Sequence, residues 1–202
     1  TGEQNRLTHF FYFQLGAAYE RNRQYNTASK NFNKALNLFP EYHNAMNYLG
    51  YMWVDIDRNI DEAAELIKKA NELDPENAAY IDSLGWLYFR QGKYDKALIE
   101  LLRASELTKE EPDSTIFEHI GDTHQKLGDT KKAKAAWKKA LDLLIKQKKK
   151  EQEPDAYLFE QIGNIYNKLG QEAKAKDAWN RSYEITPIES IRKKLQHTKQ
   201  ER

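Results

Sequence analysis

One short pattern recurs along the chain and limits what the chain can fold into. A glycine follows leucine or isoleucine and precedes a ring side chain by three residues, and the pattern returns at spacings of 34, 35, 36 and 42 residues. Periods of this length are typical of stacked helical or β units that bury an apolar face only against their neighbours. The recurring glycines are Gly16, Gly50, Gly85, Gly121 and Gly163.

The second half of each period has its own pattern of a small residue, a bulky residue four positions later and another small residue three positions after that. Spacings of four and three place all three side chains on one face of a helix. The triads are Ala28-Phe32-Ala35, Ala63-Ile67-Ala70, Ala97-Leu101-Ala104, Ala133-Trp137-Ala140 and Ala175-Trp179-Ser182.

Glycine and proline mark the ends of these segments. All five prolines close a period, and Gly92, Gly128 and Gly170 each follow the first glycine by seven residues. A left-handed residue is needed there to end one helix before a tight turn. Each period is therefore predicted to be two helices of about 13 residues, each about 20 Å long.

The interior glycine costs about 1 kcal/mol in helix propensity relative to alanine. We expect packing to offset this cost, with the glycine facing the alanines of the partner helix so that the two axes approach closely. On this hypothesis Gly85→Leu overpacks the helix pair and lowers its stability.

These motifs resemble the tetratricopeptide repeat family from residue 9 to about residue 189. The resemblance implies an all-α fold, a right-handed superhelical solenoid of five helix-turn-helix repeats with a C-terminal capping helix. The expected segments are an N-terminal segment 1–8, repeats 9–42, 43–77, 78–113, 114–155 and 156–189, and a capping helix with tail 190–202.

Three departures from the repeat pattern carry further expectations. The fourth repeat is eight residues longer, so its second helix is expected to continue to about Glu153 and to protrude. The segment 188–200 places Ile188, Ile191 and Leu195 among polar residues and predicts a helix that covers the last repeat. The N-terminus lacks a polar cap, and we expect the chain to be the C-terminal piece of a longer array.

Composition and motifs favour no catalytic chemistry. The chain has no cysteine, a net charge of +1 and no apolar run near the ~20 residues that span a bilayer. It has no phosphate-binding loop, nucleophile elbow or paired-histidine motif. His124 stands where other repeats carry Tyr or Trp and is expected to be a packed imidazole. We expect no enzyme activity, no cofactor, no metal site and no transmembrane segment.

A lysine run is the strongest local charge. Ten lysines against Asp129 and Asp142 lie between Lys126 and Lys150. The run is interpreted as a solvated helix face, a docking site for an acidic protein or lipid surface, or a nucleic-acid site. It has no arginine and no series of interleaved aromatic residues for base stacking, since Trp137 is its one aromatic residue, so nucleic acid is the least favoured.

In the resembling family the first helix of each repeat lines a concave, ligand-binding groove. At the matching positions the early repeats carry aromatic side chains that we expect to be exposed to a partner, together with Asn47, and the later ones carry acids. The aromatic residues are Phe10, Phe13, Tyr51, Trp86 and Phe89, and the acids are Asp82, Glu118, Asp122 and Glu160. Alternatively, Trp86 and Phe89 pack against the next repeat. The carboxylate clamp that holds chaperone tails in this family is absent.

The favoured function is a non-catalytic scaffold that binds a partner protein or peptide in this groove. The repeats look like the C-terminal part of bacterial envelope proteins, which favours the periplasm or outer membrane over the cytoplasm. The alternatives are a cytoplasmic regulatory module attached to an upstream effector, an array that supports a catalytic domain elsewhere, and a homodimer formed through the aromatic residues 10–13.

Overall fold

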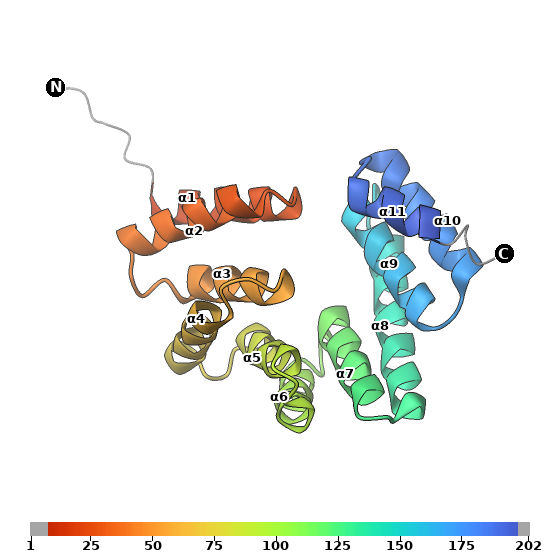
Figure 1. Cartoon of the computed structure of the whole chain (residues 1–202), viewed down its shortest axis with the longest axis horizontal. Helices are drawn as coiled ribbons and strands as arrows, with labels where there is room; N and C mark the ends of the chain where they lie inside the picture. The colour runs from red at the N-terminus through yellow and green to blue at the C-terminus, as the bar shows by residue number, and fades with distance from the viewer. Residues whose placement is uncertain (1–7, 198–202) are drawn as a thin grey trace. The chain divides into compact units, whose positions relative to one another are not determined.

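A computed structural model describes residues 8–197, which form eleven α-helices and no strand (Figure 1). Residues 1–7 of the expected N-terminal segment and residues 198–202 of the expected tail lie outside the described residues. The helices are α1 His9–Arg21, α2 Tyr25–Leu38, α3 His43–Asp55, α4 Ile60–Leu73, α5 Ala78–Arg90, α6 Tyr94–Leu107, α7 Ser114–Lys126, α8 Thr130–Lys150, α9 Ala156–Lys168, α10 Glu172–Ile185 and α11 Glu189–His197.

Consecutive helices pack as antiparallel pairs, α1 with α2 through α9 with α10, and α11 packs on α10. The all-α repeat fold expected from the sequence is confirmed. The helices fall into two compact parts, an N-terminal part that ends at Leu107 and a C-terminal part that starts at Thr108. In the N-terminal part α3 packs on α1, α2 and α5, so the first helices of successive repeats lie together.

The interior glycines bring the two helices of each pair into close contact. A Cβ atom at Gly85 would lie 2.7 Å from Leu101 Cγ, and one at Gly121 would lie 2.3 Å from Trp137 Cδ1. The expectation that the glycines face alanines was wrong, because each glycine lies under the bulky middle residue of the triad. The flanking alanines do keep the backbones close, since a Cβ at Gly85 would also meet the carbonyl oxygen of Ala97 at 3.3 Å.

The turns between paired helices use a left-handed residue, as predicted. Gly92, Gly128 and Gly170 have φ of 73°, 83° and 73°. In the first two repeats the same position is taken by Arg23 and Asp57, each with φ of 57°. These two turns therefore hold a non-glycine residue in a conformation that usually favours glycine.

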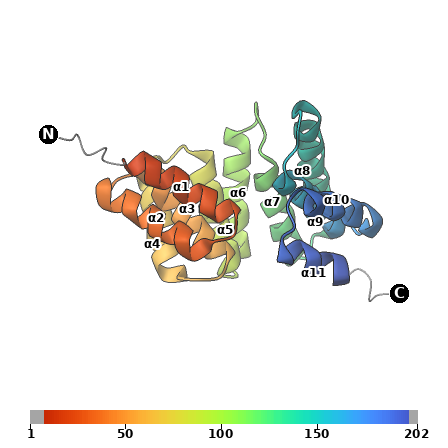
Figure 2. The ribbon, with the colours of Figure 1, turned by 90° about the horizontal axis from the view of Figure 1, so that it is seen from above.

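The long helix α8 and the short helix α11 complete the C-terminal part (Figure 2). α8 ends at Lys150, three residues before the expected Glu153. The expected protrusion is only partial, because Leu144 is buried against Leu158 whereas the last turn is exposed. Ile191 of α11 is fully buried against the last repeat, which confirms the capping helix. Among the described residues, no helix is long and apolar enough to cross a membrane.

Candidate functional site

The first helix of each repeat, here called an inner helix, carries most of the residues expected to meet a partner. The inner helices are α1, α3 and α5 in the N-terminal part and α7 and α9 in the C-terminal part. Two positions on each inner helix carry different types of residue in the two parts. One position is three residues before the glycine, and the other is one residue after it. The first position is occupied by Phe13, Asn47, Asp82, Glu118 and Glu160, and the second by Ala17, Tyr51, Trp86, Asp122 and Asn164.

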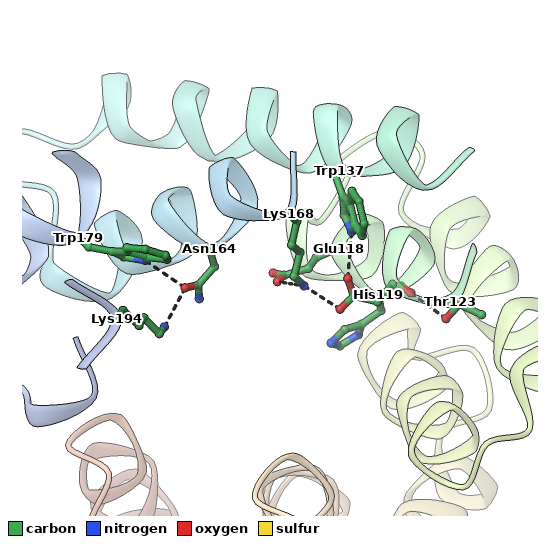
Figure 3. Close-up of polar contacts among 9 residues, drawn as sticks. Glu118, His119, Thr123, Trp137, Asn164, Lys168, Trp179 and Lys194 are labelled. Atoms are coloured by element: carbon green, nitrogen blue, oxygen red, sulfur yellow. Dashed lines mark hydrogen bonds and ion pairs between the residues drawn. The ribbon is translucent and has the colours of Figure 1, made fainter. Parts of the chain in front are cut away.

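In the C-terminal part, the residues at these two positions of α7 belong to a partly buried network of hydrogen bonds and ion pairs (Figure 3). The indole Nε1 of Trp137 donates to Asp122 Oδ1 at 2.9 Å. Lys168, at the end of α9, donates from Nζ to the other oxygen of Asp122 at 2.7 Å and to Glu118 Oε1 at 2.6 Å. The three charged side chains are 17–27% exposed, so the lysine is held between the two carboxylates away from bulk water.

The same arrangement recurs one repeat later (Figure 3). Trp179 Nε1 donates to Asn164 Oδ1 at 3.1 Å. Lys194 of α11 donates from Nζ to Asn164 Oδ1 at 2.8 Å and to Glu160 Oε1 at 2.7 Å. We call the two networks, which comprise Glu118, Asp122, Trp137, Lys168, Glu160, Asn164, Trp179 and Lys194, the lysine ladder.

In the lysine ladder the acids of the C-terminal part are paired with lysines of the same part. Burial alone lowers the pKa of Lys168, but the charges of Glu118 and Asp122 and their hydrogen bonds outweigh it and raise that pKa above its ordinary value. Glu118, Asp122 and Glu160 were expected to line the groove in which a partner binds. The structure pairs each of them with a lysine of the same part.

The aromatic residues of the N-terminal part are mostly packed. Trp86 is 9% exposed and stacks on Phe89, with ring centroids 4.6 Å apart and planes 7° apart. Tyr51 is half-buried beside the same cluster on α3, α4 and α5. Phe13 contacts Tyr42 and Tyr48 edge-on at 5.4 and 5.0 Å. The expected exposure was therefore wrong for Trp86, because the indole fills space against the preceding repeat.

Four aromatic rings on the inner helices remain exposed, and they include Phe11 at 42% and Tyr157 at 60%. Phe10 is 56% exposed, as expected, and Tyr48 is 44% exposed. Tyr48 is not among the groove residues expected from the sequence. Its one sequence signal is its place directly after Asn47, because its ring also packs on Phe13 and Phe32 and its exposure depends on that packing.

Polar groups also lie inside the N-terminal part. Asn47 and Asp82 are 5% and 6% exposed. The side-chain oxygen of Asn47 is buried and accepts no hydrogen bond from the residues that the structure describes. An unsatisfied buried acceptor costs about 1–3 kcal/mol. The oxygen of Asn47 thus contributes no hydrogen bond to the packing of the described residues.

Both histidines of α7 are buried. His119 and His124 are 5% and 9% exposed, and the packed imidazole predicted for His124 is confirmed. Burial, assisted by the nearby Lys132, lowers the pKa of His124 below its ordinary value. Among the described residues no group of three or more potential ligands is placed to hold a metal ion.

Comparisons with known proteins agree with this geometry. Family models described as tetratricopeptide repeat match residues 9–42, residues 57–112, and residues 115–143 with 156–189. A solved structure of a thermophilic TPR protein from Thermus thermophilus superposes with a TM-score of 0.71 at 19% identity, covering 95% of this chain and 98% of that one. A tetratricopeptide repeat protein from Parabacteroides merdae gives 0.66 at 20% identity, covering 95% of this chain and 71% of that one.

Curated relatives match shorter stretches. A TPR repeat-containing protein of Pseudomonas aeruginosa is 39% identical over 83 residues, which is 41% of this chain and 14% of that protein. Anaphase-promoting complex subunit 3 of Schizosaccharomyces pombe is 31% identical over 98 residues, 48% of this chain and 15% of that protein. The matched segments thus span about one-seventh of the length of these two relatives.

Proposed function

The chain belongs to the tetratricopeptide repeat family, whose members are generally protein-interaction scaffolds, and from this premise we propose that it binds a partner protein or peptide. We place the binding surface on α1 and α3, around Phe10, Asn47 and Tyr48. The proposed function is non-catalytic, in keeping with the typical use of this fold as a scaffold.

The observation that supports this surface best is the unsatisfied oxygen of Asn47. A buried side-chain oxygen that accepts no hydrogen bond within the fold is a candidate to accept one from a ligand. Tyr48 beside it is 44% exposed, and Phe10 on α1 is 56% exposed. Exposed rings next to a hydrogen-bonding group suit a peptide with apolar side chains and a polar backbone.

Site-specific photo-crosslinking tests this surface. A benzoylphenylalanine at Tyr48 is expected to capture a partner from the source cell, whereas the same probe at Ile99 is not. Ile99 is a matched control because it is 65% exposed and lies on α6, which is not an inner helix. Capture of the same proteins from both positions, or of none from Tyr48, would contradict the proposal.

The variant Asn47→Leu separates binding from folding. Leucine removes the unsatisfied acceptor, so thermal unfolding should occur at an equal or higher temperature than in the wild type. Binding of the captured partner should weaken at the same time. Lower stability with unchanged binding would show that the amide serves the fold and not the ligand.

A second candidate function is self-association through the outer side of α1. On α3 the residues that contact the preceding repeat are buried, with Ala45, Met46, Leu49 and Met52 at most 3% exposed. The register-equivalent residues of α1 include Phe11, which is 42% exposed, and Ala18, which is also exposed. No described residue covers this side, whereas α11 covers the other end. Two copies would therefore pair head to head, α1 against α1.

Light scattering after gel filtration tests the pairing. The wild type is expected to run as a dimer, and Phe11→Glu combined with Ala18→Glu as a monomer. The single change Ile99→Glu on α6 should leave the dimer intact. A wild type that stays monomeric at high concentration would refute self-association.

We further propose that the protein acts in a bacterial cell envelope and not as a cytoplasmic regulatory module. The support for the envelope is the resemblance of its repeats to those of bacterial envelope proteins, and the relative from Pseudomonas aeruginosa supports only a bacterial source. Fractionation of cells that produce the natural full-length protein is expected to recover it with envelope material. Recovery only with cytoplasmic proteins would favour the regulatory module.

A further inference from the structure

The solvent-facing side of α8 carries a row of lysines. Five exposed lysines fall within a sector of roughly 120° around the helix axis and extend along about 27 Å of its length. The one acid within this sector is Asp142. The residues of the lysine row are Lys131, Lys134, Lys138, Lys146 and Lys149.

The side chains of the lysine row have no polar partner within the part of the chain that the structure describes. None of its five members forms an ion pair, a hydrogen bond or a ring contact with any residue from 8 to 197, in contrast to three lysines on the flanks of the same helix. Lys132 pairs with Asp129 at 3.2 Å. Lys139 lies 4.0 Å from the ring centre of Phe117, and Lys148 lies 5.7 Å from that of Phe159.

The placement of the row also opposes the helix dipole at one end. Cations near a helix C-terminus are favourable and cations near its N-terminus are not. This preference accounts for Lys149 but not for Lys131, which lies in the first turn of α8. Among the other second helices, α4, α6 and α10 carry acids in their first turns, whereas α2, like α8, carries none. Lys131 thus has an electrostatic cost at the start of α8, and its side chain has no partner among residues 8–197.

The side chains around the row distinguish among its possible partners. Protein interfaces are enriched in aromatic residues and arginine and depleted in lysine. Nucleic-acid sites combine basic groups with aromatic rings or arginine forks. Residues 130–150 contain no arginine, and their one aromatic residue, Trp137, is buried. Clusters of lysines on one side of a helix are instead typical of binding to anionic lipid headgroups.

We infer that α8 lies along an anionic lipid surface and that the lysine row holds it there. The contact is electrostatic and peripheral, because no large apolar side chain in the sector is exposed; Ile145, which lies within the sector, is half-buried. Figure 2 shows the end of α8 extending past α9 and α10, which leaves its final turns accessible. The inference does not depend on the partner surface proposed for α1 and α3.

Vesicle sedimentation tests this inference. The protein is expected to sediment with vesicles of equal parts phosphatidylglycerol and phosphatidylcholine, and not with phosphatidylcholine alone. Binding should decline steeply as salt is raised above about 0.1 M, since screening shortens the reach of the charges. The variant with all five lysines of the row changed to Gln should bind more than about tenfold less tightly.

A matched variant controls for the loss of charge. Lys30, Lys68, Lys69, Lys93 and Lys96 are exposed lysines of the N-terminal part, and changing these five to Gln removes the same charge. This variant should bind the anionic vesicles nearly as well as the wild type. Circular dichroism should show equal helix content for all three proteins, and the salt dependence of the wild type tests the inference without any variant.

Three outcomes would overturn the inference. One is failure of the wild type to sediment with anionic vesicles at low salt. Another is an equal loss of binding in the row variant and the matched variant. The third is tighter binding of the row to polyglutamate or to duplex DNA than to the vesicles, which would assign the lysines to an acidic protein or a nucleic acid.

Discussion

The two parts of the molecule use the same repeat geometry with different chemistry behind the interior glycine. In the N-terminal part a Cβ at the glycine would meet an apolar side chain: Phe32, Ile67 or Leu101. In the C-terminal part it would meet the indole of Trp137 or Trp179. An indole fills the space as well as the apolar side chains do, but it also carries an N–H group that needs an acceptor when it is buried.

The need of the indole N–H for an acceptor explains why a polar residue follows the glycine in the C-terminal part. The residue after the glycine supplies the acceptor, Asp122 for Trp137 and Asn164 for Trp179. A partly buried carboxylate then needs a cation, which Lys168 provides from the next inner helix. In the N-terminal part the side chain that faces the glycine has no N–H group, and the residues after the glycine are Ala17, Tyr51 and Trp86. Glu118, Asp122 and Glu160 are therefore paired within the fold, and this pairing supports the proposal that a partner binds the N-terminal part.

The largest expected effect on stability comes from adding a Cβ atom at an interior glycine, and it should differ between the two kinds of contact. Gly121→Ala places a Cβ 2.3 Å from the rigid indole of Trp137, whereas Gly85→Ala meets Leu101, which can change rotamer, at 2.7 Å. We expect a loss of about 3 kcal/mol for Gly121→Ala and about 1 kcal/mol for Gly85→Ala. Urea denaturation measures both. Equal losses would show that the identity of the facing side chain does not matter.

Removing the central cation tests the lysine ladder. Lys168→Met leaves Glu118 and Asp122 close together without a counter-charge and should cost about 1–3 kcal/mol. Lys126→Met is the matched control, because Lys126 holds the same register in the preceding repeat and is exposed. It should change stability by less than about 0.5 kcal/mol. The ladder would lose its structural role if both changes had the same effect in chemical denaturation.

High pH should weaken the two parts for different reasons. The pKa of Lys168 is raised, so its stabilisation is complete below about pH 10.4 and is lost as the pH rises through the raised value. Burial, with the nearby Asp74, raises the pKa of Tyr80 to about 12. An unfolded tyrosine ionises near pH 10, so stability falls between about pH 10 and 12 because the folded phenol must stay neutral.

The variants Lys168→Met and Tyr80→Phe should each show a smaller loss of stability between these pH values than the wild type does. Tyr80→Phe also removes the hydrogen bonds of the phenol with Asn44 and His43, at 2.6 and 2.7 Å, so it starts from a lower stability at neutral pH. Denaturation curves at pH 8 and at high pH supply the comparison. Parallel losses in all three proteins would show that neither group dominates.

The smallest expected effect concerns the turns. Arg23 has φ of 57° at the position where the later repeats have glycine. Arg23→Gly should stabilise the first repeat by up to about 1 kcal/mol by relieving the strained backbone, whereas Gly128→Ala should destabilise by a similar amount. Thermal unfolding measures both changes. A destabilising Arg23→Gly would show that the contacts of the arginine side chain outweigh the backbone strain.

The periodic positions were enough to predict the fold from the sequence. Spaced glycines and prolines dictate where helices must end, and Gly92 and Gly128 adopt the left-handed conformation that their position requires. The capping role of Ile191 also followed from its spacing with Ile188 and Leu195. Such features are local, since they depend on backbone conformation and on the face of a single helix, and one sequence is sufficient to show them.

The candidate site depended on contacts that the sequence does not display. Spacing places Trp86 and Glu118 on the inner helices, but it does not tell whether the ring faces solvent or whether a lysine fifty positions later reaches the carboxylate. Tertiary packing decided that Trp86 is buried, that Lys168 neutralises Glu118 and that Tyr48 is exposed. Periodicity by itself thus determined the helical repeats, because helix geometry is local; tertiary structure decided which side chains a partner can reach, because burial and charge pairing depend on neighbouring repeats.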